Sequence, residues 1–500
     1  MPSTQVPELL AMDAVTLART IKAKQVSCRT VMDAFLEHID RINPKVNAIV
    51  SLQDRATLLK QADRRDEQLA RGEYLGWLHG FPQAIKDLTA TKGIATTQGS
   101  PLLRNFIPQT DAFVVERMKN SGAIIIGKTN NPEFGLGSQT YNNVFGATLN
   151  AYDQTKTAGG SSGGAAVSVA LRMQVVADGT DVGGSLRNPP AFNNVFGFRP
   201  SFGRVPPGPA DDVFVRQLGS PGPIGRTVSD VALLLSVMAG HDPRHPLSIG
   251  QDPSAFMQPL KRDFQGTRVA WFGDFEGYLA MEPGILELCQ DSLKALERTG
   301  CKIEEAQPDV PPEKTWAAFV TLRHWLTAGN LAHFYDDPAE RQQLKPEAQW
   351  EIKAGLQVSA MDVYRASVNR SEVYQAVNRL FEEYDYLVLP TSQVFPFAVD
   401  VHWPQEINGR KMDTYHRWME VCFFASLVGS PVINVPVGFN QHGLPMGMQI
   451  IGRHREDLAV LQLAYAYEQT TEWVSKYPPP LLSQAMEVGE TACRRKGEGA

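Results

Sequence analysis

The sequence predicts an α/β protein, with one large domain whose mixed β-sheet is covered by helices on both faces. Three observations favour this fold class. Short β-branched runs alternate with amphipathic helical stretches along the chain, the usual order of strands and covering helices. Several of these runs are apolar almost without interruption, as expected of strands buried on both faces. The chain also has 500 residues, 43% of them hydrophobic and 20% charged, which is enough to bury a large core.

The individual elements are predicted from hydrophobic periodicity. Apolar residues at three- and four-residue steps indicate helices, and compact apolar runs indicate strands. The predicted helices are 12–24, 29–42, 111–120, 227–240, 283–300 and 456–469. The predicted strands are VNAIVSL (46–52), GAIIIG (122–127), QVVADG (174–179), RVAWFG (268–273), YLVLP (386–390), PVINVPVG (431–438) and MGMQIIG (446–452).

The chain is predicted to form a single domain over residues 1–485. No internal repeat or long low-complexity linker divides it. The proline- and glycine-rich stretches 203–212 and 216–226 are predicted to be short loops within the fold. Residues 486–500 are polar and end in RRKGEGA, so we expect a flexible tail there.

Charge and hydropathy argue against two classes of partner. The net charge is −6 and the isoelectric point is near 6.0, without a long basic run, so we expect no nucleic-acid partner. The amino terminus has no basic segment followed by an unbroken apolar one, as a secretory signal would have. The longest apolar stretches reach about half of the roughly 20 residues that cross a bilayer, so no membrane association is expected.

The cysteines indicate a reducing compartment. They are scattered, odd in number and without a C-x-x-C pair, which fits neither a disulfide scaffold nor a zinc site. We therefore expect a cytoplasmic protein. The five positions are Cys28, Cys289, Cys301, Cys422 and Cys493.

Glycine and serine are concentrated between residues 157 and 200. The GGSSGG segment is not a typical linker, because it lies between a strand-like run and a helix-like run. Glycines allow close approach of a substrate and let consecutive N–H groups point into one pocket. We therefore expect the N–H groups of Val182, Gly183, Gly184 and Ser185 to form an oxyanion hole.

A serine nucleophile needs a base, and Lys86 is the candidate. None of the ten histidines lies near either serine cluster in the sequence. Lys86 ends the apolar run GFPQAIK, where partial burial would lower its pKa and favour the neutral amine. Considered alone, a lysine at the end of a strand would more often simply reach solvent.

The lysine and the serines belong to a series of four motifs that follow one another along the chain. GFPQAIKD, GGSSGG, GTDVGGSLR and GFRPS together resemble the amidase signature family. The resemblance is close over about residues 75–235 and looser over LVLPTS, GSPVINVPVG and GLPMGMQIIG. It implies the family's fold and a catalytic set of a serine, a second serine in a cis peptide, and a lysine.

Transferred residue by residue, the resemblance implies that Ser185 is the nucleophile. Ser161 would be the cis serine and Lys86 the base, without a metal or other cofactor. Supporting roles would fall to Ser162, Asp181 and Arg187, and Gly135 would line the acyl pocket. Arg199 and Leu186 depart from the family pattern, but both changes are conservative and leave the chemistry unaffected.

Three other interpretations are disfavoured by context. Gly122–Thr129 fits a phosphate-binding G-x-x-x-x-G-K-[ST] pattern, yet its central residues read as a buried strand. GGSSGG also fits G-x-S-x-G, but a polar segment precedes it where a nucleophile elbow needs an apolar strand. His324 and His333 are separated by nine positions with no carboxylate between them, so no metal site is expected.

The predicted function is therefore hydrolysis of carboxylic amides, and also of esters or carbamates, through a seryl acyl-enzyme. The alternative is the glutaminase subunit of a tRNA-dependent amidotransferase, on the same scaffold. The expected partner is a small-molecule amide, and a homodimer remains an open option. The sequence leaves undetermined both the natural substrate and which of residues 310–420 line the pocket.

Overall fold

An eight-stranded mixed sheet forms the centre of the protein, for which a computed structural model describes residues 5–483. A three-stranded sheet and a two-stranded hairpin accompany it. The strands are β1 Ile49–Val50, β2 Pro82–Lys86, β3 Ile124–Thr129, β4 Val176–Asp181, β5 Phe196–Arg199, β6 Ser220–Gly225, β7 Arg268–Trp271, β8 Lys302–Glu305, β9 Tyr386–Pro390, β10 Glu406–Ile407, β11 Arg410–Lys411, β12 Val432–Phe439 and β13 Pro445–Ile451.

Helices make up much of the remaining chain. The α-helices are α1 Gln5–Ala11, α2 Ala14–Lys22, α3 Cys28–Ile42, α4 Arg55–Ala70, α5 Phe113–Asn120, α6 Gly163–Ala170, α7 Asn188–Phe192, α8 Val228–Met238, α9 Ile285–Arg298, α10 Pro312–Asp336, α11 Pro338–Arg341, α12 Pro346–Gly355, α13 Ala360–Glu383, α14 Phe423–Val428, α15 Asp457–Thr471 and α16 Trp473–Lys476. Short 3₁₀ helices are η1 Asn43–Lys45, η2 Pro101–Leu103, η3 Glu133–Gly135, η4 Pro253–Met257 and η5 Arg417–Cys422.

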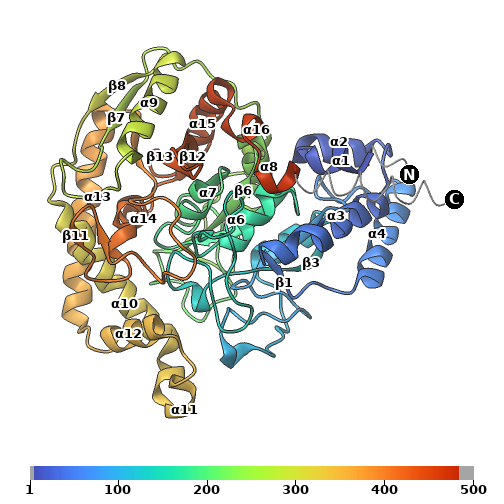
Figure 1. The fold of residues 1–500 in the computed structure, drawn as a ribbon, viewed down its shortest axis with the longest axis horizontal. Helices are drawn as coiled ribbons and strands as arrows, with labels where there is room; N and C mark the ends of the chain where they lie inside the picture. The colour runs from blue at the N-terminus through green and yellow to red at the C-terminus, as the bar shows by residue number, and fades with distance from the viewer. Residues whose placement is uncertain (1–4, 484–500) are drawn as a thin grey trace.

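The large sheet has the order β4-β6-β5-β12-β13-β9-β7-β8. Its strands pair antiparallel from β4 to β9 and parallel from β9 through β7 to β8, so the predicted mixed sheet is confirmed. Helices α8, α9 and α15 pack on one face of it, and α6 and α7 pack on the other. Figure 1 shows the smaller sheet with α3 and α4 at one end of the molecule and β7, β8 and α9 at the other.

The helix ends follow from local capping chemistry. Ser27 precedes α3, and its hydroxyl accepts the N–H of Thr30 at 3.0 Å, satisfying a donor that the first helical turn leaves free. Thr227 does the same for α8 through the N–H of Asp230. Each of the six predicted helices and seven predicted strands overlaps an observed element, although VNAIVSL keeps only two residues in β1.

One loop prediction was wrong. Residues 216–226 contain β6, which lies between β4 and β5 in the large sheet. Its two prolines, Pro221 and Pro223, argued against a strand because proline cannot donate to a ladder. Pairing with β5 involves only Ile224 and Gly225, so the proline-containing part of β6 has a ladder partner on the β4 side alone. The predicted loop at 203–212 is confirmed.

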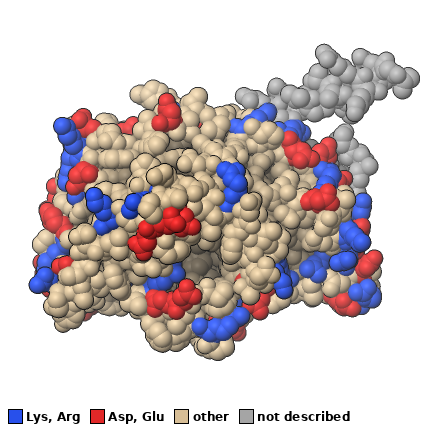
Figure 2. Space-filling view, turned by 90° about the horizontal axis from the view of Figure 1, so that it is seen from below, with Lys and Arg blue, Asp and Glu red and all other residues tan. Residues whose placement is uncertain are grey.

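Other predictions concern regions or properties that the fold does not test. The whole predicted tail, 486–500, lies outside the described residues, and the domain boundary at 485 stays a prediction. None of the helices among residues 5–483 is both long and apolar enough to cross a bilayer. Acidic and basic side chains are interspersed on the face in Figure 2, which is hollowed near its centre.

Helix α6 connects the serine-rich loop to the core. All eight of its residues are buried, and it begins directly after Ser162. Gly164 allows its backbone to lie against β3 and the loop before β1. A Cβ there would be 2.4 Å from the backbone nitrogen of Asn130 and 2.5 Å from the carbonyl oxygen of Ala48. These neighbours are backbone atoms, so they cannot rotate away as a side chain could.

We predict that Gly164→Ala destabilises the protein by about 1–3 kcal/mol or more, the cost of overpacking a well-filled core. The control is Gly329→Ala, in the exposed middle of α10, where a Cβ meets nothing within 4 Å. Alanine should stabilise that helix by about 0.5–1 kcal/mol. Thermal unfolding at one scan rate compares the two variants. Equal melting temperatures would contradict the close packing of α6.

Candidate active site

The ammonium group of Lys86 lies at the centre of a cluster of hydroxyls. Lys86 ends β2, and its Nζ donates to Ser161 Oγ at 2.7 Å, Ser162 Oγ at 2.8 Å and Thr180 Oγ1 at 3.0 Å. Ser161 and Ser162 immediately precede α6, and Thr180 belongs to β4. The end of one strand, a loop and a neighbouring strand therefore meet at one nitrogen atom.

The surroundings of Lys86 favour its neutral form. The side chain has no exposed area, and this burial lowers its pKa to about 7 against the opposing influence of Asp178 and Asp181. Among the described residues, no carboxylate lies within ion-pair distance of Nζ. Asp178 instead accepts the backbone N–H of Lys86 at 3.1 Å, and burial raises the pKa of this carboxyl to about 6.

Further contacts hold the peptide that precedes Ser161. The Gly160–Ser161 peptide bond is cis, the isomer that the resemblance implied. The Ser138 hydroxyl donates to the carbonyl oxygen of Gly160 at 2.6 Å and accepts from Asn188 Nδ2 at 2.8 Å. Gly135 lies against this serine, because a Cβ at Gly135 would be 3.5 Å from Ser161 Oγ.

Ser185 lies on the loop that follows β4 and is half-buried. We refer to residues 181–187 as the Ser185 loop. Asp181 holds this loop by accepting the N–H of Gly184 at 2.8 Å and the N–H of Leu186 at 3.0 Å. In the described part of the chain, the Ser185 hydroxyl has no hydrogen-bond partner, so a direct Ser185–Ser161 bond is not present. Such catalytic bonds often tighten only when substrate binds.

The four expected oxyanion donors do not all have free N–H groups. The N–H of Gly184 is bound to Asp181, so the assignment of Gly184 as a substrate donor is not supported by this geometry. Its φ of +116° suits glycine and turns the N–H toward the carboxylate. The N–H groups of Val182, Gly183 and Ser185 have no acceptor among residues 5–483 and remain the candidate donors.

A buried ion pair anchors the Ser185 loop to the large sheet. Arg187 donates to both oxygens of Asp181, at 2.9 and 3.0 Å, and neither side chain is exposed. Burial alone would raise the pKa of Asp181, but Arg187 and then Arg199 outweigh it and lower the pKa to about 2. Arg187 also donates to Gln449 on β13 at 2.6 Å, so the loop is tied to a central strand.

Comparison with known proteins identifies the family. A family model described as Amidase matches residues 30–461. The chain belongs to the amidase family. An acylamidase from Rhodococcus erythropolis is 33% identical over 474 residues, covering 94% of this chain and 98% of that protein. A glutamyl-tRNA(Gln) amidotransferase subunit from Carboxydothermus hydrogenoformans is 34% identical over 498 residues, covering 94% and 99%.

Solved structures agree on fold and chemistry. A bacterial aryl acylamidase of the amidase signature family has a TM-score of 0.87 to this amidase at 28% identity, covering 93% of this chain and 97% of that one. The predicted single α/β domain and the amidase signature resemblance are therefore confirmed. This amidase is an amide-bond hydrolase.

The sequence analysis missed several residues of the candidate site. Thr180 contacts Lys86 Nζ, Asp178 contacts the Lys86 backbone, and Ser138 and Asn188 support Ser161. Thr180 lies inside the GTDVGGS motif and could have been found from its hydroxyl. Ser138 and Asn188 have ordinary sequence contexts, so only the folded chain reveals their roles.

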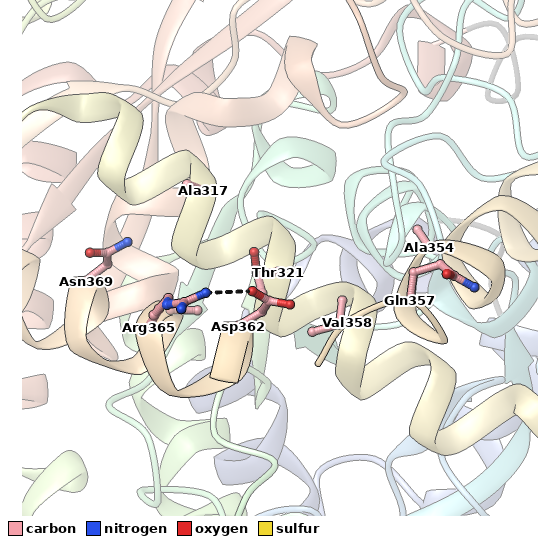
Figure 3. A pocket seen from close by; sticks show the side chains of 9 residues that line it. Ala317, Thr321, Ala354, Gln357, Val358, Asp362, Arg365 and Asn369 are labelled. Atoms are coloured by element: carbon pink, nitrogen blue, oxygen red, sulfur yellow. Dashed lines mark hydrogen bonds and ion pairs between the residues drawn. The ribbon is translucent and has the colours of Figure 1, made fainter. Parts of the chain in front are cut away.

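The structure shows the surroundings of the phosphate-loop pattern and of His324. Lys128 and Thr129, the end of the phosphate-loop pattern, belong to the fully buried strand β3. His324 binds Glu351, and no cluster of three or more metal-binding side chains occurs within residues 5–483. A groove of about 290 Å³ is lined by residues of α10, of the end of α12 and of α13. Asp362 and Arg365 pair in it at 3.4 Å (Figure 3). Its lining contains none of Lys86, Ser161 and Ser185.

Proposed function

We propose that the enzyme cleaves carboxylic amides through a seryl acyl-enzyme, with Ser185 as nucleophile, Ser161 as proton relay and Lys86 as base. The observation that carries this proposal is the fully buried Lys86 Nζ, which lies 2.7 Å from Ser161 Oγ and whose partners are three hydroxyls and, at 3.5 Å, the carbonyl oxygen of Thr180. Esters and carbamates, which present the same carbonyl to the nucleophile, would be further substrates.

The three hydroxyls around Lys86 can bond to a neutral amine as well as to an ammonium group, because a hydroxyl can donate or accept. A protonated lysine has three N–H donors, whereas the neutral amine has two and a lone pair that accepts. In the neutral form, Lys86 donates to Ser162 and Thr180 while the Ser161 hydroxyl donates to Nζ. Ser161 Oγ then has its lone pairs free to accept a proton from Ser185 once substrate brings the two serines together.

The acylation step follows from this arrangement. The Ser185 proton passes to Ser161 while the Ser161 proton passes to Lys86, and Ser185 Oγ attacks the carbonyl carbon. The carbonyl oxygen becomes an anion beside the N–H groups of Val182, Gly183 and Ser185, and one such donor is worth about 3–4 kcal/mol. The tetrahedral intermediate then expels the amine, which takes the proton back along the same path.

Deacylation uses the same groups with water in place of the amine. Water attacks the acyl-enzyme and its proton passes through Ser161 to Lys86. As the bond between the acyl carbon and Ser185 Oγ breaks and the acid leaves, Lys86 returns this proton through Ser161 to Ser185 Oγ, so the serine and the neutral lysine are both regenerated. No cofactor or metal enters these steps. Asp181 and Arg187 hold the Ser185 loop, and Gly135 leaves room beside Ser161 for the acyl group. The cytoplasmic location and the homodimer stay predictions.

The second candidate is the glutaminase subunit of a tRNA-dependent amidotransferase. The chain is 34% identical to the amidotransferase subunit from Carboxydothermus hydrogenoformans and 33% identical to the acylamidase from Rhodococcus erythropolis. These two values favour both functions equally. The two functions differ in their requirement for a partner. An independent amidase hydrolyses simple amides as the purified chain, whereas the glutaminase would need its complex for glutamine hydrolysis.

We predict that a fluorophosphonate probe labels Ser185 in the purified chain and that simple aryl amides are hydrolysed by it. Ser185→Ala should abolish both, because the attacking atom is absent, and mass spectrometry of the labelled peptide locates the site. Ser161→Ala should fold normally and lose about 10²–10⁴-fold in rate, as general acid–base transfer typically contributes. Labelling at Ser161, Ser162 or a cysteine would refute Ser185 as the nucleophile.

For Lys86, we predict that Lys86→Arg is nearly as inactive as Lys86→Ala. A guanidinium stays protonated at every working pH and cannot accept the relay proton. A lysine with a purely structural role would tolerate arginine better than alanine. Activity is measured as kcat/KM on folded variants, with folding checked by circular dichroism. An arginine variant that retains a large share of activity would rule out Lys86 as the base.

A further inference from the structure

A buried cluster of charged and aromatic side chains surrounds Glu351 of α12, outside the triad. The Glu351 carboxylate has no exposed area and lies within hydrogen-bond distance of four side chains. Arg323 Nε at 2.7 Å and His324 Nδ1 at 2.6 Å bind it from α10. His416 Nε2 at 2.7 Å and the Tyr415 hydroxyl bind it from the segment before η5. One carboxylate therefore connects α10, α12 and the 415–416 segment.

The cluster is ionic at its centre. Burial alone would raise the pKa of Glu351, but Arg323 and His416 outweigh it and hold that pKa well below its usual range. Burial lowers the pKa of His416 to about 4, against the opposing influence of Glu351. A buried ion pair is weak evidence for stability, because apolar residues of similar volume often do as well. Its best-attested use is to fix one arrangement of the segments that it joins.

The connected segments also carry three stacked rings, which we call the ring stack: Trp316 and Phe319 from α10 and Phe423 from α14. Phe319 and Phe423 lie 3.8 Å apart with an interplanar angle of 18°, and Trp316 lies 5.7 Å from Phe423 at 14°. Phe319 is one helical turn before Arg323 on α10. The ring of His416 meets Phe423 edge-on at 6.4 Å.

The ring stack packs against the Ser185 loop. A Cβ at Gly183 would be 3.0 Å from Phe423 and 3.1 Å from Phe319. Gly183 precedes Ser185 by two residues, and its N–H is one of the candidate oxyanion donors. A carbonyl bound at that N–H therefore has the ring stack beside it. Movement of α10 relative to the 415–423 segment would shift the rings and change the space next to the reacting carbonyl.

We propose that Glu351 is a positioning residue that holds the ring stack against the Ser185 loop and so sets the preference for bulky apolar acyl groups over small ones. This inference rests on the proposed acyl-enzyme mechanism at Ser185. Glu351 does not itself touch substrate. Its effect passes through Arg323 to Phe319 and through His416 to Phe423. The substrate class that the site favours is an amide whose acyl group is aromatic or similarly large and apolar.

The test compares two substrates with one leaving group, the 4-nitroanilides of acetic and benzoic acid. Glu351→Gln keeps the size of the side chain and removes its charge, and Tyr415→Phe removes only one hydroxyl from the cluster. Both should lower the ratio of kcat/KM for the benzoyl substrate to that for the acetyl substrate, mainly through KM. For Glu351→Gln we expect this ratio to fall roughly tenfold. This lies within the about 10²-fold loss of rate that a 1 Å misplacement can cause.

The matched control is Tyr467→Phe. Tyr467 is also a buried tyrosine with a bonded hydroxyl, which donates to the carbonyl oxygen of Pro436 at 2.7 Å, away from the cluster. Tyr467→Phe should leave the ratio of kcat/KM for the benzoyl substrate to that for the acetyl substrate unchanged. If Glu351→Gln does not fold, Tyr415→Phe decides the question. An unchanged ratio in the folded cluster variants, with equal losses on both substrates, would overturn the proposal.

A double-mutant cycle tests whether the effect passes through the rings. Phe319→Leu should lower the benzoyl-to-acetyl ratio by itself, and Tyr415→Phe should add little in that background, because its target is already altered. Full additivity would refute a path through Phe319. Fluorophosphonate labelling of Ser185 is followed in every variant. A wild type that is not labelled disproves the acyl-enzyme mechanism, whereas labelled variants with an unchanged ratio disprove only the role of Glu351.

Discussion

The burial of Lys86 among hydroxyls is the constraint on which the site depends. Withdrawing an ammonium from water costs several kcal/mol, and a carboxylate partner would normally offset that cost. Here the partners are Ser161, Ser162 and Thr180, which stabilise the charge less than an anion would, so the pKa falls to about 7. In the proposed mechanism, this makes the strand-end lysine a base at neutral pH and the serine beside it the proton relay.

The rest of the fold keeps this arrangement in place. The hydroxyls come from two segments, the loop before α6 and strand β4, and their relative position depends on how α6 packs against β3. The Ser185 loop is fixed by Asp181 and Arg187, and Arg187 is in turn bonded to β13 in the centre of the large sheet. On the far side of that loop, the ring stack takes its position from the Glu351 cluster. The groups of the proposed mechanism are thus held in place by charged side chains that take no part in the proton transfers.

Much of the fold was predictable from the sequence, because strands buried on both faces and amphipathic helices leave direct periodic signals. Strand β6 was missed because Pro221 and Pro223 argue against a ladder, and only the pairing shows that β6 is partnered by β4 along its whole length. Lys86, Ser161 and Ser185 came from motif resemblance, since no spacing rule connects positions 75 and 99 residues apart. The geometry does not support a donor role for Gly184, because an internal acceptor, Asp181, takes its N–H. The Glu351 cluster gave no sequence signal, because its partners are 27 to 65 residues away.

The central claim, a neutral Lys86 as base, is tested most directly by the pH dependence of kcat/KM for the wild type and Asp178→Asn. A base must lose its proton to act, so the wild-type rate should rise with pH through about 7 and stay high in the alkaline range. Asp178 raises the pKa of Lys86 through its negative charge. Asparagine removes that charge and can still accept the Lys86 N–H, so the rise should move to lower pH. A rate that falls as pH increases, or the same inflection in both proteins, would contradict Lys86 as the titrating base.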